Sequence, residues 1–398
     1  MARKNPCASG IDVLLRTKGK ALKGLSIAIL TNPTGVTRDL APTVDALAML
    51  PGVKLRALFG PEHGIRGHVQ DAVPVPSSVD PRTGIPVYSL YDDHLAPPPE
   101  MLDGIDLIVY DIQDIGVRYY TYIYTMVHAL RVAARQGVGF MVLDRPNPLG
   151  GRLVEGNVVA PGFESFVGML PLAIRHGMTA GEIAMMVDRE EGLGAALEIV
   201  PAENWRRSWG YSQTGLPWVQ PSPNMPTLDT VLVYPGTCLL EGTNLSEGRG
   251  TTRPFEVFGA PWVSGHDLAF HLNLQDLPGV RFRPTSFVPA FSKYAGETCE
   301  GVQIHVMDPA AYEPVRTGLV IIQALLGLYP EEFDWIAADP TGGAVSRGMP
   351  PFFDLLMGTD DVRRRLEEGE DVSRIVESWA PAREDFIRVR ERYLIYGD

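Results

Sequence analysis

The chain has 398 residues, enough for two or three domains, because a single hydrophobic core stops growing well below this length. Its composition, 45% hydrophobic and 21% charged, is typical of a globular protein and excludes a long disordered chain. The formal net charge of -13 disfavours nucleic acid as a partner, because acidic surfaces repel phosphate backbones. A local cluster of arginines can still bind a small anion.

The cysteines and the apolar segments set further limits. Cys7, Cys238 and Cys299 are too few and too widely spaced for a disulfide framework or a zinc knuckle. No stretch is long and apolar enough for a membrane span, and the N-terminus lacks the apolar core of a signal peptide. The sequence therefore predicts a cytoplasmic protein; the alternative is an exported protein whose signal is absent from this sequence. The oligomeric state is not predicted.

The first half of the chain alternates strand and helix patterns. Short apolar runs bounded by glycine and proline predict buried strands, and longer amphipathic runs predict helices. The expected strands are residues 25–31, 53–59, 105–111 and 139–144, and the expected helices are residues 44–50 and 119–136. Fully apolar strands separated by helices are typical of a parallel sheet covered on both faces. We therefore expect a Rossmann-like, mostly parallel α/β domain.

The second half has a different pattern. Residues 205–262 are rich in proline, glycine and tryptophan and predict long loops. A strand is expected at 302–307, and helices at 314–328 and 362–392. The sequence thus predicts a Rossmann-like catalytic domain over residues 1–258. A smaller α+β auxiliary domain over residues 259–398 would contribute to the cleft.

Polar residues follow each of the four expected strands. Ligands bind at the carboxyl ends of strands in open α/β sheets, so these residues are candidates for a site. They are Asn32 after the first strand; Glu62, His63 and Arg66 after the second; Asp111, Gln113, Asp114 and Arg118 after the third; and Asp144 and Asn147 after the fourth.

Glu62 is the expected general acid. It stands between a proline and a histidine on a loop with glycines, and partial desolvation at the mouth of a sheet raises a carboxyl pKa into the range that acid catalysis needs. The structural alternative is a glutamate that caps the next helix. Asp111 and Asp114 are the candidates for a second carboxyl, since glycosidases typically use two. An aspartate that ends a buried strand is also a common structural cap.

The sequence favours neither a metal nor a cofactor. It contains no HExxH, CxxC or calcium-loop spacing. The turn after the first strand is TNPTG, without the GxGxxG of dinucleotide-binding proteins, and the glycine-rich residues 241–253 lack the GK[ST] ending of a Walker loop. Those residues can cradle an anion instead, with Arg249 and Arg253 available to pair with a carboxylate.

Several long motifs resemble one known family. The segments LTNPTGVTRDL, ALFGPEHGIRG, VYDIQDIGVRYYTYI, VLDRPNPLGG, PSPNMPTLDTVLVYPGT and EGTNLSEGRGTTRPFEVFGAPW are similar to the NamZ family of exo-β-N-acetylmuramidases. The resemblance extends to the SKYAGE segment and the YLIYGD end. It implies a Rossmann-like domain with a smaller auxiliary domain, a cleft between them, and a catalytic glutamate that falls on Glu62.

The resemblance also implies a carbohydrate substrate, terminal N-acetylmuramic acid, whose lactyl group carries a carboxylate. Family members are often exported, which leaves the compartment open. The candidate substrate-binding residues are polar and aromatic side chains within the motifs, with Arg118 and Arg249 as the first choices for the carboxylate: Asn32, His63, Arg66, Gln113, Arg118, Tyr122, Asp144, Asn147, Asn224, Asn244, Glu247 and Arg249.

The leading hypothesis is an exo-acting glycosidase in which Glu62 protonates the leaving oxygen. Asp111 or Asp114 would activate water, stabilise the transition state or attack it, and assistance by the substrate's acetamido group is a further option. The alternative is a non-catalytic protein that binds peptidoglycan fragments or amino sugars. A nucleotide-dependent oxidoreductase is disfavoured because the dinucleotide motif is absent.

Overall fold

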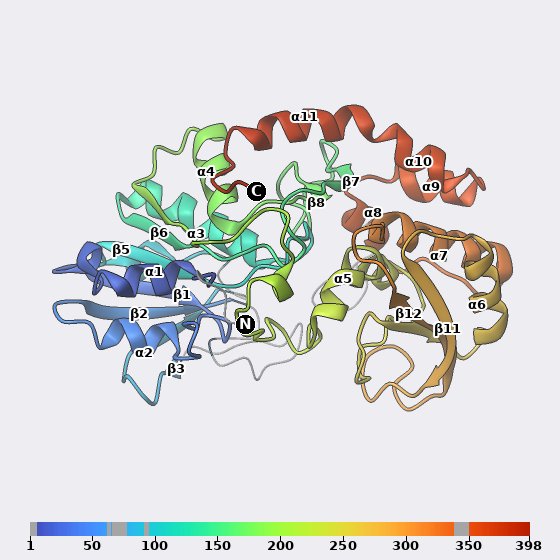
Figure 1. The fold of residues 1–398 in the computed structure, drawn as a ribbon, viewed down its shortest axis with the longest axis horizontal. Helices are drawn as coiled ribbons and strands as arrows, with labels where there is room; N and C mark the ends of the chain where they lie inside the picture. The colour runs from blue at the N-terminus through green and yellow to red at the C-terminus, as the bar shows by residue number, and fades with distance from the viewer. Residues whose placement is uncertain (1–5, 62–64, 66–77, 91–94, 338–349) are drawn as a thin grey trace.

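The computed structural model describes residues 6–61, 65, 78–90, 95–337 and 350–398 (Figure 1). Its largest element is a seven-stranded sheet with the order β3-β4-β2-β1-β5-β6-β9. All neighbouring strands run parallel except β3 and β4. The strands are β1 (Ser26–Thr31), β2 (Lys54–Gly60), β3 (Ser78–Val79), β4 (Pro86–Ser89), β5 (Leu107–Asp111), β6 (Gly139–Leu143) and β9 (Leu197–Val200).

Alternating side chains of the central strands face two separate cores. In β1, Ile27 and Ile29 pack with apolar residues of α1 (Gly10–Arg16) and α2 (Thr43–Ala48). Ala28 and Leu30 face the larger core instead, which includes apolar residues of α3 (Tyr122–Gln136) and α4 (Ala180–Glu190). Burial on both faces explains why these strands are continuous apolar runs.

The six parallel strands have the order of a Rossmann fold. The chain moves outward from β1 through β2 to β4, then returns to β5 beside β1 and moves outward the other way through β6 to β9. The predicted α/β class is therefore confirmed. The reversal lies between β1 and β5, and ligands of such sheets bind outside the carboxyl ends of the strands at this point.

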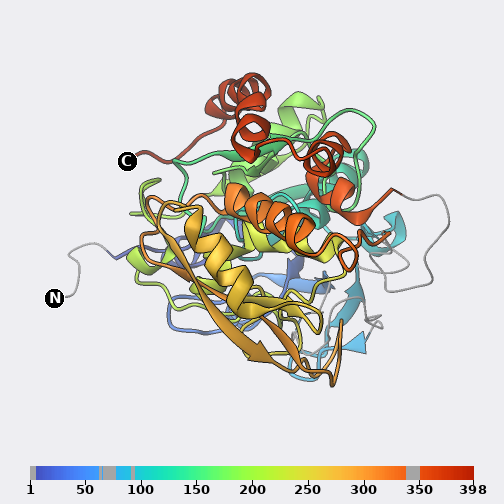
Figure 2. The same ribbon diagram turned by 90° about the vertical axis from the view of Figure 1, so that its right-hand side faces the viewer.

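A smaller unit follows in the chain (Figure 2). Its three-stranded antiparallel sheet has the order β10-β12-β11, with α6 packed on it and α7 packed on α6. The remaining elements are β7 (Glu155–Val158), β8 (Ala173–Arg175), β10 (Val257–Ala260), β11 (Val280–Phe287), β12 (Cys299–Val306), α5 (Leu228–Thr237), α6 (Gly265–Leu274), α7 (Pro314–Leu328), α8 (Phe352–Met357), α9 (Asp361–Glu367), α10 (Val372–Ser378) and α11 (Ala380–Glu391).

Helix α5 lies within the region predicted to be loops, so that part of the prediction is wrong. Its sequence contains Pro235 and Gly236, which weaken the helical pattern. The helix is kept by packing: a side chain at Gly236 would clash with the backbone of Pro314, and one at Gly318 would clash with Gly236. The two glycines allow α5 and α7 to approach closely.

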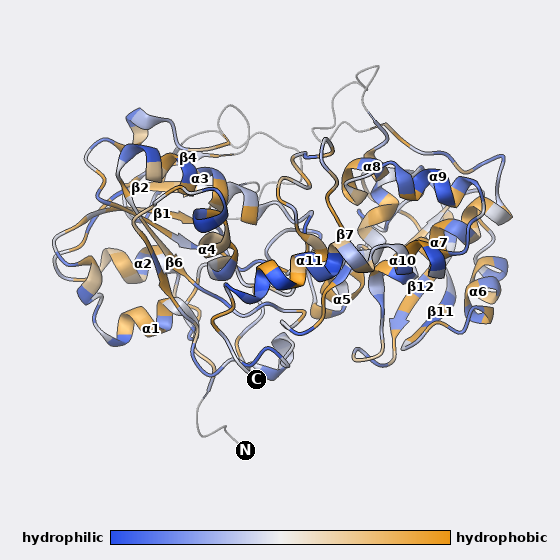
Figure 3. Ribbon diagram, turned by 90° about the horizontal axis from the view of Figure 1, so that it is seen from above, coloured by the Kyte–Doolittle hydropathy of each residue, from blue (hydrophilic) through white to orange (hydrophobic). Residues whose placement is uncertain are grey.

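The C-terminus returns to the large sheet. Helix α11 runs along the top of the molecule, and α9 and α11 carry long hydrophilic stretches, in contrast to the mostly hydrophobic strands (Figures 1 and 3). Beyond α11, the Ile395 amide donates to Glu182 Oε1 (3.0 Å) and the Tyr396 hydroxyl donates to Asp144 Oδ2 (2.6 Å). The division of the chain at residue 258 falls within β10 and stays a prediction.

Candidate functional site

The structure brings together several of the predicted residues at the point where the strand order reverses. Asn32 directly follows β1, Asp111 ends β5, and Gln113 follows two residues later. Thr34 links the two strand ends: its hydroxyl donates to Asn32 Oδ1 (2.5 Å), and the Gln113 amide donates to the same hydroxyl oxygen (2.8 Å). The loops that follow β1 and β5 are therefore held together by hydrogen bonds at the candidate site.

Asp111 is held in a buried ion pair. Its carboxylate accepts two hydrogen bonds from the Arg145 guanidinium, at 2.6 and 2.9 Å, and one from the Thr43 hydroxyl. The Asp111 side chain is 0% exposed and that of Arg145 is 6% exposed. Burial alone would lower the pKa of Arg145, but the charge and hydrogen bonds of Asp111 raise it. Asp111 thus joins β5 to the end of β6, and we infer a structural role for it.

Asp114 is a different kind of carboxyl. Its Oδ2 accepts from the Gly116 amide (2.6 Å), whereas its Oδ1 has no hydrogen-bond partner among the residues that the structure describes. Burial raises the pKa of Asp114 to about 7, partly offset by the backbone hydrogen bonds of Gly116 and Ile115. A fixed carboxyl that titrates near neutrality suits acid–base or nucleophilic chemistry better than a permanently paired one.

Gln113 precedes Asp114 in the chain, and Asn147 lies beside Gly116. The Gln113 side-chain amide donates to the carbonyls of Asp114 (2.7 Å) and Pro146 (2.8 Å), while its Oε1 has no hydrogen-bond partner within the described chain. Asn147 donates to the Met178 carbonyl (2.9 Å) and accepts from the Leu149 amide (2.9 Å). Gln113 therefore has a buried acceptor without a partner in the described protein, whereas both polar atoms of the Asn147 side chain are hydrogen-bonded.

Asp144 does not fit its predicted role in substrate binding. It is 0% exposed and accepts from the hydroxyls of Thr179 (2.6 Å) and Tyr396 (2.6 Å) and from the Gly181 amide (2.9 Å). Burial raises the pKa of Asp144 to about 6. These contacts tie the first turn of α4 and the C-terminal segment to the end of β6, so Asp144 stabilises the fold.

Asn32 and Tyr122 hold one carbonyl of the PSPNMP segment. The Tyr122 hydroxyl donates to the Pro221 carbonyl at 2.5 Å, and the Asn32 side-chain amide lies 3.5 Å from the same oxygen. Asn224 is buried in the same segment, 5% exposed. The two side chains thereby seat this segment beside the carboxyl end of β1.

Arg118 does not fit the prediction that it binds the lactyl carboxylate. Its side chain is 0% exposed, and its guanidinium donates to the carbonyls of Asn157, Leu172, Leu356 and Met357 at 2.7–2.9 Å. Burial lowers the pKa of Arg118 to about 10. It joins the loop after β5 to β7, to the segment before β8 and to the end of α8, and a buried cation in this position is structural.

Replacing Arg118 with methionine is expected to lower the free energy of unfolding by about 2–3 kcal/mol, because buried carbonyls lose their donors. The affinity for N-acetylmuramic acid, the sugar that the family resemblance implies, should not change. Denaturant unfolding and the inhibition constant of the free sugar measure the two effects. The control is Arg152→Met: the side chains of Arg152 and Asp398 form an ion pair and are 61% and 48% exposed, so this change should lower stability much less than Arg118→Met does. A weakened sugar affinity without loss of stability would contradict this assignment.

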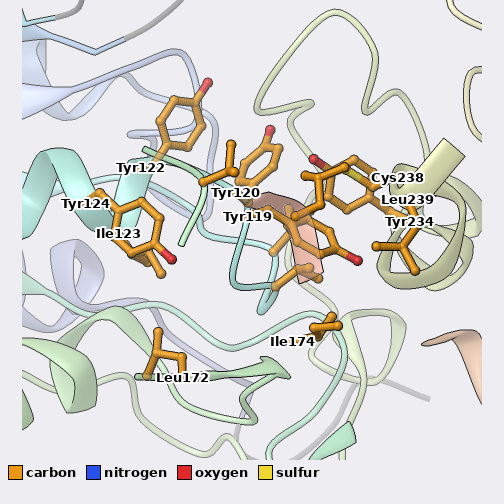
Figure 4. Packing of buried hydrophobic residues seen from close by; sticks show 14 of the residues in the cluster. Tyr119, Tyr120, Tyr122, Ile123, Tyr124, Leu172, Ile174, Tyr234, Cys238 and Leu239 are labelled. Atoms are coloured by element: carbon orange, nitrogen blue, oxygen red, sulfur yellow. The ribbon is translucent and has the colours of Figure 1, made fainter. Parts of the chain in front are cut away.

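A row of aromatic side chains leads away from the sheet (Figure 4). Tyr120 lies edge-on to Tyr122, with ring centroids 5.1 Å apart, and to Tyr234 at 5.9 Å. Tyr234 in turn contacts Phe255 at 4.8 Å. Tyr120 precedes α3, Tyr122 begins it, Tyr234 belongs to α5 and Phe255 precedes β10, so the row joins the loop after β5 to the smaller unit.

Arg249 stands at the far end of this row. Its guanidinium carbon lies 5.1 Å from the centroid of the Phe255 ring, and its Nη2 donates to Glu241 Oε1 (2.9 Å). Its Nε lies 3.3 Å from Glu247 Oε1. The side chain is 19% exposed. Arg249 is therefore held beside the Phe255 ring by the carboxylates of Glu241 and Glu247, and its role as a carboxylate ligand stays a prediction.

Two other predicted residues of this segment have partners within the protein. Glu247 is 2% exposed. Its carboxylate accepts a hydrogen bond from Lys293 Nζ (3.0 Å) and forms an ion pair with Arg249. Asn244 donates to the Glu332 carbonyl (2.7 Å) and accepts from the Asp334 amide (3.0 Å). Glu247 therefore positions the side chains of Arg249 and Lys293, whereas Asn244 joins its loop to residues 332–334 by hydrogen bonds.

Glu62, His63 and Arg66 lie outside the described residues. The structure places Gly60 at the end of β2 and describes Pro61 as buried, and Glu62 follows Pro61 in the sequence. The roles predicted for these three residues stay predictions.

Two residues of the site were not among the predictions. Lys293 donates to the carbonyls of Leu240 (3.2 Å) and Glu241 (3.3 Å) besides Glu247, and His176 lies 3.8 Å from Asp114. Lys293 belongs to the SKYAGE motif, so the motif was a usable signal. His176 is a single histidine between a strand and a helix, and no sequence pattern marks it.

The described part of the chain contains no group of three or more His, Cys, Asp or Glu side chains that could hold a metal ion. No helix within it has the length and apolar character that a membrane span requires.

Both halves of the chain match models of one family. Residues 27–229 match the model described as Exo-beta-N-acetylmuramidase NamZ, N-terminal, and residues 232–396 match Exo-beta-N-acetylmuramidase NamZ, C-terminal. The chain is 47% identical over 395 residues to the peptidoglycan beta-N-acetylmuramidase NamZ of Bacillus subtilis (strain 168), a match that spans 99% of this chain and 92% of the relative.

Two crystal structures of DUF1343 family proteins from Bacteroides fragilis NCTC 9343 have the same fold. They are 38% and 30% identical to this chain, with TM-scores of 0.89 and 0.77. Each similarity covers 99% of this chain and 100% of the other.

Proposed function

Because the chain belongs to the exo-beta-N-acetylmuramidase NamZ family, we propose that it is an exo-acting glycoside hydrolase that releases terminal N-acetylmuramic acid from peptidoglycan-derived glycans. The observation that carries this proposal is the 47% identity, over 99% of the chain, to a peptidoglycan muramidase. The geometry adds Asp114, which follows the carboxyl end of β5 and whose pKa burial raises to about 7.

Glu62 is the proposed general acid. It follows Pro61, the residue after the end of β2, and β2 is the direct neighbour of β1 in the sheet. Its role rests on this place in the sequence and on the PEHG motif of the family. Protonation of the leaving oxygen would make the sugar–oxygen bond easier to break and develop positive charge on the ring.

Asp114 is the proposed second carboxyl, in preference to Asp111. The Asp111 carboxylate is occupied by Arg145 and Thr43, whereas Asp114 Oδ1 has no hydrogen-bond partner among the described side chains and backbone. An ionised Asp114 stabilises positive charge on the sugar, and it can also activate water, attack the ring, or orient the acetamido group for assistance. Each of these tasks needs a carboxylate oxygen that the protein does not occupy.

The test is hydrolysis of a chromogenic N-acetylmuramic acid glycoside, together with analysis of the sugar released from peptidoglycan digests. Free N-acetylmuramic acid is the expected product, and glycans that end in another sugar should stay intact. Near-normal turnover by Glu62→Gln would rule out Glu62 as the acid. Binding of the glycan without release of sugar would instead favour a non-catalytic binding protein.

Arg249 is the proposed ligand of the lactyl carboxylate. Replacing it with methionine is expected to weaken inhibition by N-acetylmuramic acid about 10- to 100-fold, because a charge-assisted hydrogen bond is lost. Inhibition by N-acetylglucosamine, which lacks the lactyl group, should change much less. Inhibition constants for the two sugars measure this difference. Arg253→Met is the matched control, because Arg253 is 52% exposed and pairs with Glu256. If inhibition by both sugars weakened equally, the assignment of Arg249 would be contradicted.

A further inference from the structure

His176 lies beside Asp114 in the segment between β8 and α4. It is 0% exposed. The two residues are brought together because the loop after β5 pairs with β8: Val117 forms a bridge with Arg175, and the Arg118 amide donates to the Ile174 carbonyl (2.8 Å). His176 is thus fixed against the loop that carries Asp114 by backbone hydrogen bonds.

The hydrogen bonds of His176 determine which ring nitrogen carries the proton. Its Nδ1 accepts from the Met178 amide at 3.1 Å, so this nitrogen has no hydrogen. In a neutral imidazole the proton must then be on Nε2. Nε2 lies 3.8 Å from Asp114 Oδ2 and has no hydrogen-bond partner among the residues described. A shift of about 1 Å would bring this N–H to hydrogen-bond distance of the carboxyl.

Burial and nearby positive charges keep the imidazole neutral. Burial is the largest cause that lowers the pKa of His176 to about 3, and the guanidinium groups of Arg390, Arg118 and Arg207 act in the same direction. On the other side, the phenols of Tyr110 and Tyr124 are the titratable groups that interact with Asp114. Asp114 therefore changes its charge over a pH range in which His176 does not.

We propose that His176 is a positioning residue for Asp114: during hydrolysis its Nε2–H moves within hydrogen-bond distance of the ionised carboxylate and stabilises it. This inference rests on the proposed function, in which Asp114 is the second carboxyl. Burial opposes the ionisation that the reaction needs. A neutral N–H donor that comes within hydrogen-bond distance of the carboxylate favours the charged form most when that charge develops, which is the kind of interaction that lowers a reaction barrier.

The test compares His176→Leu, which removes the donor, with His176→Gln, which keeps an N–H at a similar reach. His176→Leu is expected to lower kcat/KM about 10- to 100-fold, the effect of a lost hydrogen bond to a charged group. It should also move the acid limb of the kcat/KM pH profile to higher pH. His176→Gln should keep the acid limb of the pH profile at the same pH as in the natural protein, and most of the activity.

A combined variant tests whether His176 acts through Asp114. Asp114→Asn with His176→Leu should be no slower than Asp114→Asn alone. An unshifted acid limb in His176→Leu, or equal losses in the Leu and Gln variants, would overturn the role of His176 while leaving Asp114 in place. Full activity of Asp114→Asn would overturn the assignment of Asp114 and, with it, this inference.

A measurement on the unmodified protein covers the case in which His176→Leu does not fold. With ¹⁵N-labelled histidine, NMR should show a neutral His176 ring with hydrogen on Nε2 between about pH 5 and 8. The Nε2 shift should change as Asp114 titrates. A ring that protonates in this range, or that carries its hydrogen on Nδ1, would overturn the proposal.

Discussion

Asp114→Asn is expected to lower turnover of a muramic acid glycoside by about 10²- to 10⁴-fold while making the protein more stable above pH 7. The loss of activity follows from removing the carboxylate that is proposed to face the sugar. The gain in stability follows from burial, since burial raises the pKa of Asp114 from 3.8 to about 7. A neutral asparagine avoids the cost of a buried charge.

The sign of the pH dependence follows from that raised pKa. The contribution of protonated Asp114 to stability is complete below pH 3.8, its unperturbed pKa, and is lost as the pH rises through about 7. The advantage of Asp114→Asn over the natural protein should therefore be small at pH 5 and on the order of 2 kcal/mol at pH 8. Denaturant unfolding at the two pH values, with kcat from the same preparations, measures both effects.

Asp144→Asn is the matched control for Asp114→Asn. Asp144 is also buried, but both of its carboxylate oxygens accept hydrogen bonds from the described protein, from Thr179, Tyr396 and Gly181. Its replacement should lower stability, and kcat of the folded fraction should change little. An Asp114→Asn variant that is both fully active and less stable at pH 8 would contradict the role given to Asp114.

Asp111→Asn is expected to destabilise the protein by about 3–5 kcal/mol, because it leaves the Arg145 guanidinium buried without its counter-charge. Replacing both partners by apolar residues, Asp111→Leu with Arg145→Met, should cost less than the single change. The free energy of unfolding from denaturant titration measures both variants.

An accessible ion pair is the control for Asp111 and Arg145. The side chains of Arg131 and Glu191 are 24% and 32% exposed, and Arg131→Gln should change stability by less than about 1 kcal/mol. If Asp111→Asn kept its stability but lost its activity, Asp111 would be a catalytic carboxyl and its structural role would be wrong.

The fold of the first half could be predicted because its strands are buried on both faces. Continuous apolar runs such as β1 and β5 are the direct result of a parallel sheet between two helical layers. Helix α5 could not be predicted in the same way. Its proline and glycine weaken the helical pattern, and the close contact between Gly236 and Gly318 that keeps it is visible only in three dimensions.

The candidate site could be located from the sequence, but the roles of its charged residues could not. Polar residues after strands indicate where a ligand binds. Whether a carboxyl or a guanidinium is available depends on partners far away in the chain. The Asp144 carboxylate accepts a hydrogen bond from Tyr396, 252 positions later in the chain. The Arg118 guanidinium donates one to the carbonyl of Met357, 239 positions later. Sequence patterns show residue types at intervals, and they do not show such pairings.

The most direct test of the roles given to Asp114 and Asp111 is chemical rescue of Asp114→Ala by sodium azide. Azide is a small anion that can occupy the space of the lost carboxylate and attack the sugar in its place. We expect azide to raise the turnover of Asp114→Ala on a muramic acid glycoside, with a glycosyl azide as product where Asp114 acts as the nucleophile or as the base that activates water. No gain in turnover and no glycosyl azide from Asp114→Ala, with rescue of Asp111→Ala instead, would contradict the account.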